Sequence, residues 1–181
     1  MDTQKHNEKV VNYFKSVQSL VDNLGKVKAS AGVHSDKGEH NVKKALWNEF
    51  GTKHISKGVS FFKDGVELRI RKGTDISIPA RPFLRLYLYP KDILEIEKEF
   101  VKNLDVMLRF HKRLAESPLK SATSIMDNVG RVGAELQREK IKNSNSIKPN
   151  APLTQLIQGF DHPLYDTGEL LASIDSKIER R

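Results

Sequence analysis

Histidine is the residue type in this chain best suited to bind a metal or to transfer a proton near neutral pH. The chain has six histidines: His6, His34, His40, His54, His111 and His162. None of them is part of a His-x-x-x-His or a Glu-x-x-His pair, the spacings that put two metal ligands on one helix face. His34 and His40 flank a loop with Asp36 and Glu39, where a metal site is the alternative to an ordinary solvated loop. We expect the solvated loop.

The other catalytic patterns are also absent from the sequence. Glu95, Glu97 and Glu99 lie in a predicted helix rich in lysine, which indicates a solvated face rather than acid–base chemistry. There is no glycine-rich phosphate loop, no nucleophile elbow and no cysteine to hold a metal. We therefore expect no enzyme activity, no catalytic residue, no cofactor and no metal. A small hydrolase or nuclease is the hypothesis with the least support.

Arg81 and Arg85 are the strongest candidates for anion recognition. Their guanidinium groups could bind a phosphate or an oxyanion, or they could fork onto a carboxylate such as Glu49 and fix the local backbone. We favour the structural pairing.

A basic cluster forms a second candidate surface. The formal net charge is +8, from 31 Lys and Arg against 23 Asp and Glu. Most of these charges are interleaved along the chain, which is typical of a solvated surface. The best candidate face for an acidic partner, protein or DNA, combines Lys63, Arg69, Arg71 and Lys72. No aromatic–basic motif of an RNA-binding sheet accompanies it.

The elements that position these residues follow from periodicity and capping signals. Apolar residues at helical spacing predict helices over 6–24, 41–50, 90–116 and 118–142 and a last helix through Ile178. Asn41 and Asp166 are the expected N-caps of two of them, and Gly51 the end of one. Gly130 and Gly133 leave the predicted helix 118–142 without side chains at two positions, which predicts that another backbone approaches closely there.

Alternating residues predict strands near 26–33, 59–63, 66–72 and 75–79. Asp64-Gly65 marks a hairpin between the second and third. We expect an α+β fold, in which a small, mostly antiparallel sheet with this hairpin packs against the long helices. The predicted core domain is 1–142. A linker over 142–152 leads to a C-terminal helical arm, the two together forming a region of 143–181.

The stretch IPARPFLR, residues 78–85, is read as a stiff corner. Ile78 and Arg81 each precede a proline and are therefore held in extended conformations. Pro82 has the fixed φ that suits the first residue of a helix. The segment is predicted to turn the chain from strand to helix.

Three segments in this order resemble one family: ALWNEFGT (45–52), IPARPFLR (78–85) and HPLYDTGELLASI (162–174). The set is similar to the tail-completion or head–tail connector proteins of tailed bacteriophages, also called virion morphogenesis proteins. The resemblance covers roughly residues 27–175. The hairpin lengthens the gap between the first two segments and is a departure from the family pattern; it suggests an extra element that reaches a neighbour.

The resemblance implies a structural virion protein, a subunit of a ring, typically six-fold, at the phage neck. Such a ring completes the tail, joins it to the head connector and lets DNA pass. The implied partners are further copies of this chain and other neck and tail proteins, with no membrane. The implied location is the virion, after synthesis in the host cytoplasm. The residues that carry over have fold and assembly roles: Glu49, Phe50, Gly51, Pro79, Arg81, Pro82, Phe83, Asp166, Thr167, Gly168 and Leu170.

Composition agrees with these expectations and leaves one alternative open. The sequence has no apolar run long enough for a membrane span, and its first ten residues are too polar for a signal peptide. The alternative function is a basic nucleic-acid-binding module without catalytic activity. Whether the C-terminal arm swaps between subunits or folds back on its own core is left open.

Overall fold

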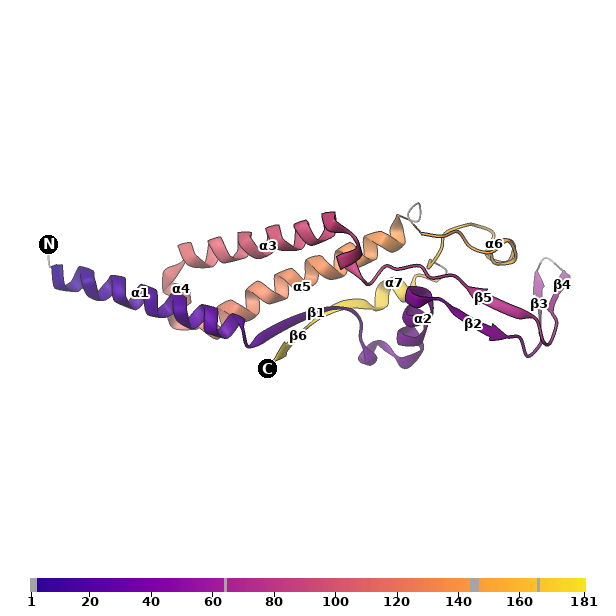
Figure 1. Cartoon of the computed structure of the whole chain (residues 1–181), viewed down its shortest axis with the longest axis horizontal. Helices are drawn as coiled ribbons and strands as arrows, with labels where there is room; N and C mark the ends of the chain where they lie inside the picture. The colour runs from indigo at the N-terminus through magenta and orange to yellow at the C-terminus, as the bar shows by residue number, and fades with distance from the viewer. Residues whose placement is uncertain (1–2, 64, 144–146, 166) are drawn as a thin grey trace. The chain divides into compact units, whose positions relative to one another are not determined.

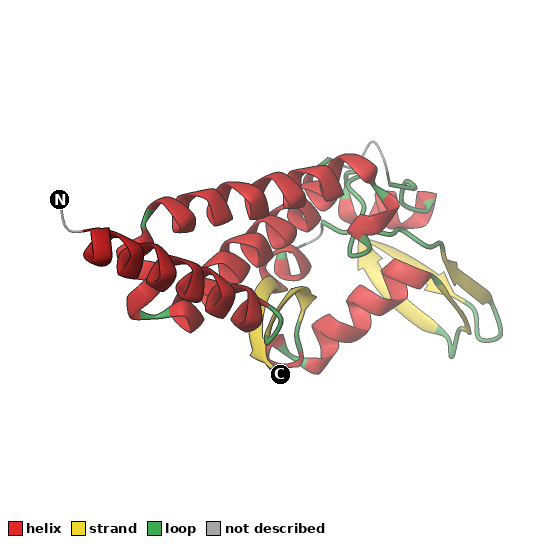
Figure 2. Ribbon diagram, turned by 60° about the vertical axis from the view of Figure 1, so that its left-hand side comes forward, coloured by secondary structure: helices red, strands yellow, loops and turns green. Residues whose placement is uncertain are grey.

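The computed structural model describes residues 3–63, 65–143, 147–165 and 167–181. The predicted α+β class is confirmed, with two-stranded antiparallel sheets and long helices (Figures 1 and 2). In chain order the elements are α1 (Thr3–Leu24), β1 (Val27–Val33), η1 (Ser35–Lys37), α2 (Glu39–Phe50), β2 (Thr52–Ile55), β3 (Val59–Lys63), β4 (Val66–Ile70), β5 (Asp75–Ile78), η2 (Leu86–Leu88), α3 (Pro90–Arg109), α4 (His111–Glu116), α5 (Pro118–Lys142), α6 (Pro152–Gln158), α7 (Glu169–Ser173) and β6 (Ile174–Arg180).

The chain forms two compact units, and each draws on separate stretches of sequence. Unit 1 comprises Met1–Gly32, Leu86–Leu136 and Asp175–Arg181; unit 2 comprises Val33–Arg85 and Gln137–Ile174. This grouping differs from the predicted division into 1–142 and 143–181. No helix of the described residues is both long and apolar enough to cross a membrane.

The core of unit 1 lies where the helices meet. Leu20 of α1, Leu114 of α4 and Ile125 of α5 are fully buried there, and Phe100 and Leu104 of α3 pack against them. Phe100, Leu104 and Ile125 come from the apolar stripes that the helical spacing predicted, whereas Leu20 and Leu114 do not. In contrast, the N-terminal half of α1 leaves apolar side chains in solvent, with Phe14 66% exposed.

Two small strands pack closely against α5 in unit 1. A β-carbon added at Gly130 would lie 3.3 Å from that of Ala29 and 3.2 Å from that of Ser176, and one at Gly133 would lie 3.2 Å from that of Ala31. The prediction that these glycines allow close approach of another backbone is therefore confirmed. The neighbours are the alanines of β1 and a serine of β6.

The predicted last helix is wrong beyond Ser173, where the chain becomes strand β6 and pairs with β1. Arg181 donates its amide to the carbonyl of Lys26, and Lys28 pairs with Glu179, so the two strands run antiparallel. Ile174 and Ile178 are four residues apart, a spacing that suits a helix as well as one face of a strand. The partner strand, 140 residues earlier in the sequence, decides between the two.

Unit 2 contains a long hairpin rather than one broad sheet. In its first ladder, β2 pairs with β5 from Thr52↔Ile78 to Ile55↔Asp75; in its second, β3 pairs with β4 from Val59↔Ile70 to Lys63↔Val66. Ser56 joins the ladders, because its amide donates to Thr74 and its carbonyl accepts from Gly73, each at 2.8 Å. The predicted β3–β4 hairpin is confirmed. Strand β2 was missed, because Thr52–Ile55 is short and mostly exposed.

Three helix boundaries differ from the predictions. The predicted helix 90–116 is interrupted at Phe110, whose φ of −94° and ψ of 55° end α3 before α4 begins. Pro82 does not begin a helix; α3 begins at Pro90. Asn41 is not an N-cap, because Gly38 holds that position and the Asn41 side chain donates from Nδ2 back to the Lys37 carbonyl.

Gly133→Val is expected to destabilise unit 1. The added methyl groups have no room beside Ala31, and overpacking of this kind typically costs about 1–3 kcal/mol. Ser124→Val, at an exposed position of the same helix, is the control and should change the free energy of unfolding by less than about 1 kcal/mol. Urea denaturation measures both, and equal effects of the two variants would contradict the close packing.

Candidate functional site

The Glu49 carboxylate, at the end of α2, is the centre of the candidate site. It is 1% exposed, yet it accepts hydrogen bonds from three successive backbone amides, those of Phe83 (2.8 Å), Leu84 (2.9 Å) and Arg85 (3.3 Å). The Arg85 side chain adds a fourth bond, from Nε at 2.6 Å. A buried charge is stable only when it is paired and hydrogen-bonded in this way.

Arg85 also contacts the backbone of Glu49 and the ring of Phe50. Its Nη2 donates to the Glu49 carbonyl at 3.2 Å, and its guanidinium carbon lies 4.7 Å from the centre of the Phe50 ring. The predicted fork onto Glu49 is thus made by Arg85. Phe50 is otherwise 60% exposed, and Phe83 is fully buried beneath the corner.

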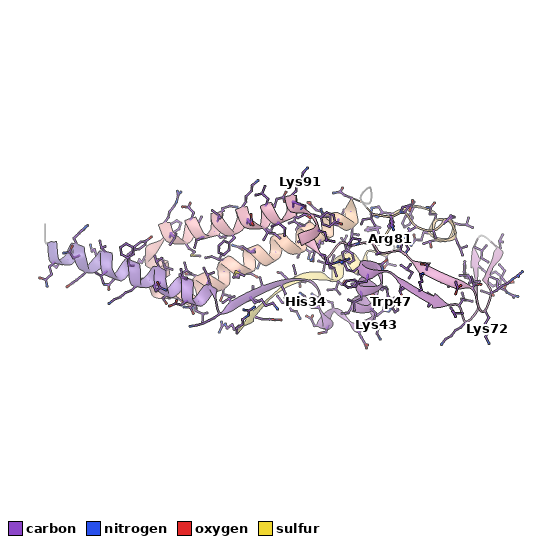
Figure 3. The ribbon with its side chains drawn as sticks, viewed as in Figure 1. His34, Lys43, Trp47, Lys72, Arg81 and Lys91 are labelled. Atoms are coloured by element: carbon purple, nitrogen blue, oxygen red, sulfur yellow. The ribbon has the colours of Figure 1, made fainter. Side chains whose placement is uncertain are left out.

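Arg81 holds a different part of the chain. Its Nε donates to the Lys148 carbonyl at 2.8 Å and its Nη2 to the Pro149 carbonyl at 2.9 Å, with longer contacts to the side-chain oxygens of Asn48 and Asn150. Its pairing with Glu49 was therefore a wrong expectation. Arg81 is 6% exposed; burial lowers its pKa from the usual value, while Asp161 opposes that shift. Figure 3 labels Arg81 in the region of α2, the helix that supplies its partner Asn48.

The predicted linker is consequently an ordered part of unit 2 over 147–150. Ile147 and Asn150 are buried, and the Asn150 amide donates to the Asp161 carboxylate at 2.9 Å. Its side chain also donates to Gln158 at 3.1 Å. The polar, turn-rich composition of this segment predicted a free linker. Composition does not reveal that the carbonyls of Lys148 and Pro149 accept hydrogen bonds from Arg81, which is distant in the sequence.

Gly51 allows α2 to pass directly against the corner. Its φ is +75°, and a β-carbon there would lie 2.9 Å from both the Ala80 nitrogen and the Ile78 oxygen. No side chain fits at that position. The Arg81 amide also donates to the Asn48 carbonyl at 2.6 Å. The first and second motif segments are therefore joined backbone to backbone.

The third motif segment joins the same unit through α7. Leu170 is buried, and Glu169 pairs with Lys44 of α2 at 2.7 Å. That hydrogen bond, rather than any burial, lowers the pKa of Glu169 from its ordinary value. Gly168, at φ +77°, is the N-cap of α7, and the Thr167 hydroxyl accepts from the Glu169 amide at 3.4 Å. The predicted cap Asp166 lies outside the described residues.

The three motif segments surround one hollow of about 390 Å³ in unit 2. Asn48, Pro79, Arg81, Thr167 and Gly168 are among its lining residues. Arg81 donates to protein carbonyls, and Lys44 and Glu169, which also line the hollow, pair with each other. Pro82 lies in the corner, half-buried.

The basic residues of the hairpin are placed apart from this hollow. Arg69 lies on the exposed β4, where it binds the Glu67 carboxylate at 3.1 Å and the Ser60 hydroxyl at 3.2 Å. Arg71 and Lys72 follow it and are exposed, Lys72 where one ladder passes into the next (Figure 3). Lys63 ends β3, but its side chain is outside the described part of the structure. Over the described residues, no three histidine or acidic side chains gather into a metal-binding group.

Sequence reasoning missed Asn48, Lys148 and Asn150 as parts of the site. Lys148 and Pro149 act through their carbonyls, and a carbonyl carries no residue-specific signal.

Comparison with models of known protein families, with curated proteins and with solved structures finds no match for this chain.

Glu49→Ala is expected to lower the free energy of unfolding by about 3 kcal/mol or more, because it leaves Arg85 and three buried amides without their acceptor. Glu39→Ala removes an exposed pair with Lys43 on the same helix and is the control, expected to cost less than about 1 kcal/mol. Thermal and urea unfolding compare them. Equal stability of the two variants would show that Glu49 does not hold the corner.

Arg81→Ala is expected to destabilise unit 2 by about 2 kcal/mol, because hydrogen bonds to a charged donor are lost from buried carbonyls. Arg81→Lys keeps the charge without the fork and should recover only part of this stability. Arg131→Ala, which breaks an exposed pair with Asp127, is the control. The role of Arg81 would be disproved by an alanine variant that unfolds and assembles as the wild type does.

Proposed function

We propose that this chain is a structural subunit of a ring at the neck of a tailed bacteriophage, where the ring completes the tail and joins it to the head connector. The proposal includes a homo-oligomer, six-fold by resemblance, with other neck and tail proteins as partners and DNA passing through the lumen. Its location is the virion. Its action is mechanical, by holding surfaces together, and requires no reaction.

One observation carries the proposal. The three segments that resemble the neck family are separated by more than twenty residues at each interval, yet all three meet in unit 2. Glu49 joins the first to the second, and Glu169 of the third pairs with Lys44, the residue just before the first. Residues of all three segments also line the same hollow. A chance likeness of turn and cap residues would not require the segments to contact one another.

Exposed apolar side chains support an assembled state. Phe14 of α1 is 66% exposed, Phe62 of β3 is 76% exposed and Val101 of α3 is 62% exposed. An apolar helix face left in solvent, such as the one that Val10, Phe14 and Val21 form on α1, is typical of surfaces that other proteins cover. The site itself, built from carbonyls, amides and saturated ion pairs, serves to hold backbone segments in place.

Nucleic-acid binding is a second candidate function, favoured by the charge of the hairpin. Residues 53–72 carry six Lys and Arg against two acidic residues. Binding to phosphates through these side chains would weaken steeply as salt rises. A ring through which DNA passes does not need affinity for DNA. A measurement of DNA binding therefore tests the second candidate function without testing the first.

Light scattering coupled to size exclusion is expected to give a particle close to six times the 20.6 kDa of one chain. Antibody labelling or mass spectrometry should find the protein in mature particles of the phage whose genome encodes it. Retention of duplex DNA on a filter at low salt, measured in parallel, tests the second candidate. A protein absent from particles would defeat the neck proposal whatever its mass in solution.

A further inference from the structure

Arg81 is a buried cation with which no described carboxylate forms an ion pair. It is only 6% exposed, and its donors go to two backbone carbonyls and, at 3.4 Å each, to the amide oxygens of Asn48 and Asn150. Arginine is rarely buried to this extent unless an anion pairs with it. Arg85 of the same corner shows the usual arrangement, because it is bound to the Glu49 carboxylate at 2.6 Å.

One donor of the Arg81 side chain is also left over. A guanidinium group has five N–H groups. Nε uses its one and Nη2 uses both of its own, whereas Nη1 donates a single bond, to Asn48. The other N–H of Nη1 has no acceptor among the described residues. Asp161 opposes the lowering of the Arg81 pKa that burial causes, but it accepts its own hydrogen bond from the Asn150 amide.

The hollow of unit 2 lies beside this guanidinium group. Arg81, Asn48 and Asn150 all line it, and its volume of about 390 Å³ is within the range of about 300–1,000 Å³ that is common for small-molecule sites. The remaining wall is mixed, with hydroxyl and amide groups beside apolar side chains. The apolar ones are Ile76, Ile78, Pro79, Leu164 and Leu170.

The charges of the wall favour an anion with a single negative charge. Lys44 is a second cation of the wall, but it is paired at 2.7 Å with Glu169, which lines the same hollow. The described wall therefore has two positive charges and one negative charge. A doubly charged phosphate would meet the Glu169 carboxylate and only one spare guanidinium donor, whereas phosphate sites commonly offer several donors. A monocarboxylate on an apolar stem fits both the donor and the isoleucines.

The backbone at Leu164 is a supporting feature of the same wall. Its φ of 65° makes it the one residue other than glycine with a positive φ in the described part of the chain. This conformation is disfavoured for a bulky side chain, and residues held in it concentrate at ligand sites and other functional positions. The wall of the hollow is thus held in a conformation that local backbone energetics oppose.

We propose that the hollow binds a monocarboxylate, whose oxygen accepts a hydrogen bond from Nη1 of Arg81 and whose apolar stem lies against Ile76, Ile78 and Leu164. The carboxylate belongs to a small free acid or to a glutamate side chain of another protein, since both present the same group. The site requires unit 2 alone and goes beyond the proposed ring, because a subunit can hold such a ligand whether or not it assembles.

Titration of the wild-type protein with sodium butyrate tests the site. Nitrogen-15 NMR follows the arginine Nε–H signals, with sodium chloride keeping the ionic strength constant. The Arg81 signal is expected to shift saturably, with a dissociation constant in the millimolar range or tighter. The Arg85 signal should shift much less, because that guanidinium already has its carboxylate.

Two further probes test the chemistry of the ligand in the same assay. Butyramide, the uncharged analogue of butyrate, should bind at least tenfold more weakly, and inorganic phosphate should bind more weakly than butyrate. An Arg81 signal that shows no saturable shift would overturn the proposal. Equal binding of butyrate and butyramide, or tighter binding of phosphate, would overturn it as well.

A variant that fills the hollow locates the bound butyrate. Thr154→Trp places a large ring at a position that lines the hollow and makes no described bond to Arg81, and it should weaken butyrate binding at least tenfold. Leu156→Trp, on the same helix at a 56% exposed position outside the lining, is the matched control and should stay within twofold of wild type. Equal affinities of the two variants would place butyrate elsewhere and overturn the site. The wild-type titration does not depend on how either variant folds.

The carboxylate of Asp166 is tested separately, because Asp166 lies outside the described residues. Asp166→Asn should bind butyrate as the wild type does. Binding that appears only in this variant would show that the chain supplies the carboxylate itself, and would overturn the proposal of an external ligand.

A capped glutamate distinguishes the two sources of the carboxylate. N-acetyl-glutamate N-methylamide that binds more tightly than butyrate supports the site and assigns it to a side chain of another protein. Weaker binding than butyrate supports the site and assigns it to a small free acid. Failure of every carboxylate to bind overturns this inference and leaves the ring proposal standing, because the ring is tested by assembly and by presence in particles.

Discussion

The buried Glu49 carboxylate is the constraint on which the rest of unit 2 depends. A carboxylate at 1% exposure must find donors, and here it takes three consecutive backbone amides and one guanidinium nitrogen. Those bonds fix the backbone of 83–85, and the fixed backbone in turn presents Arg81 to the carbonyls of 148 and 149. Gly51 permits the approach, because any β-carbon there would collide with the corner. Hydrophobic burial stabilises the interior, but the hydrogen bonds of the Glu49 carboxylate determine how the backbone of residues 83–85 lies against the end of α2.

The same logic explains why the corner is rich in proline and arginine. Prolines limit the conformations that the unfolded segment can adopt, which reduces the entropy lost when it is ordered. Arginine supplies several donors in a rigid fork and can therefore satisfy acceptors from more than one segment. Pro79, Pro82, Arg81 and Arg85 together make a joint, and the hydrogen-bond partners of its two arginines lie in two distant parts of the sequence, 48–49 and 148–150. In the ring proposed above, a joint of this kind keeps the surfaces attached to it in a defined geometry.

Local signals in the sequence predicted local structure well. The bounds of α5, the start of α3 at Pro90 and the β3–β4 turn follow from proline, glycine and alternation, which act over a few residues. The pairing of Arg85 with Glu49 could be anticipated from chemistry. The strand β6, the ordered segment 147–150 and the true partners of Arg81 could not, because each depends on a residue that is far away in sequence. The assembly role remains a proposal, since it concerns contacts outside one chain.

The pairing of β1 with β6 has a consequence for how the protein is made. About 140 residues separate these strands, so at a synthesis rate of roughly 5–20 residues per second β1 waits on the order of ten seconds for its partner. During that interval the nascent chain carries an open strand edge on the ribosome, and such edges invite pairing with other chains. Truncated translation products would keep that edge permanently. Until β6 has been made, the edge of β1 is therefore open to any protein that binds unpaired strands, including chaperones.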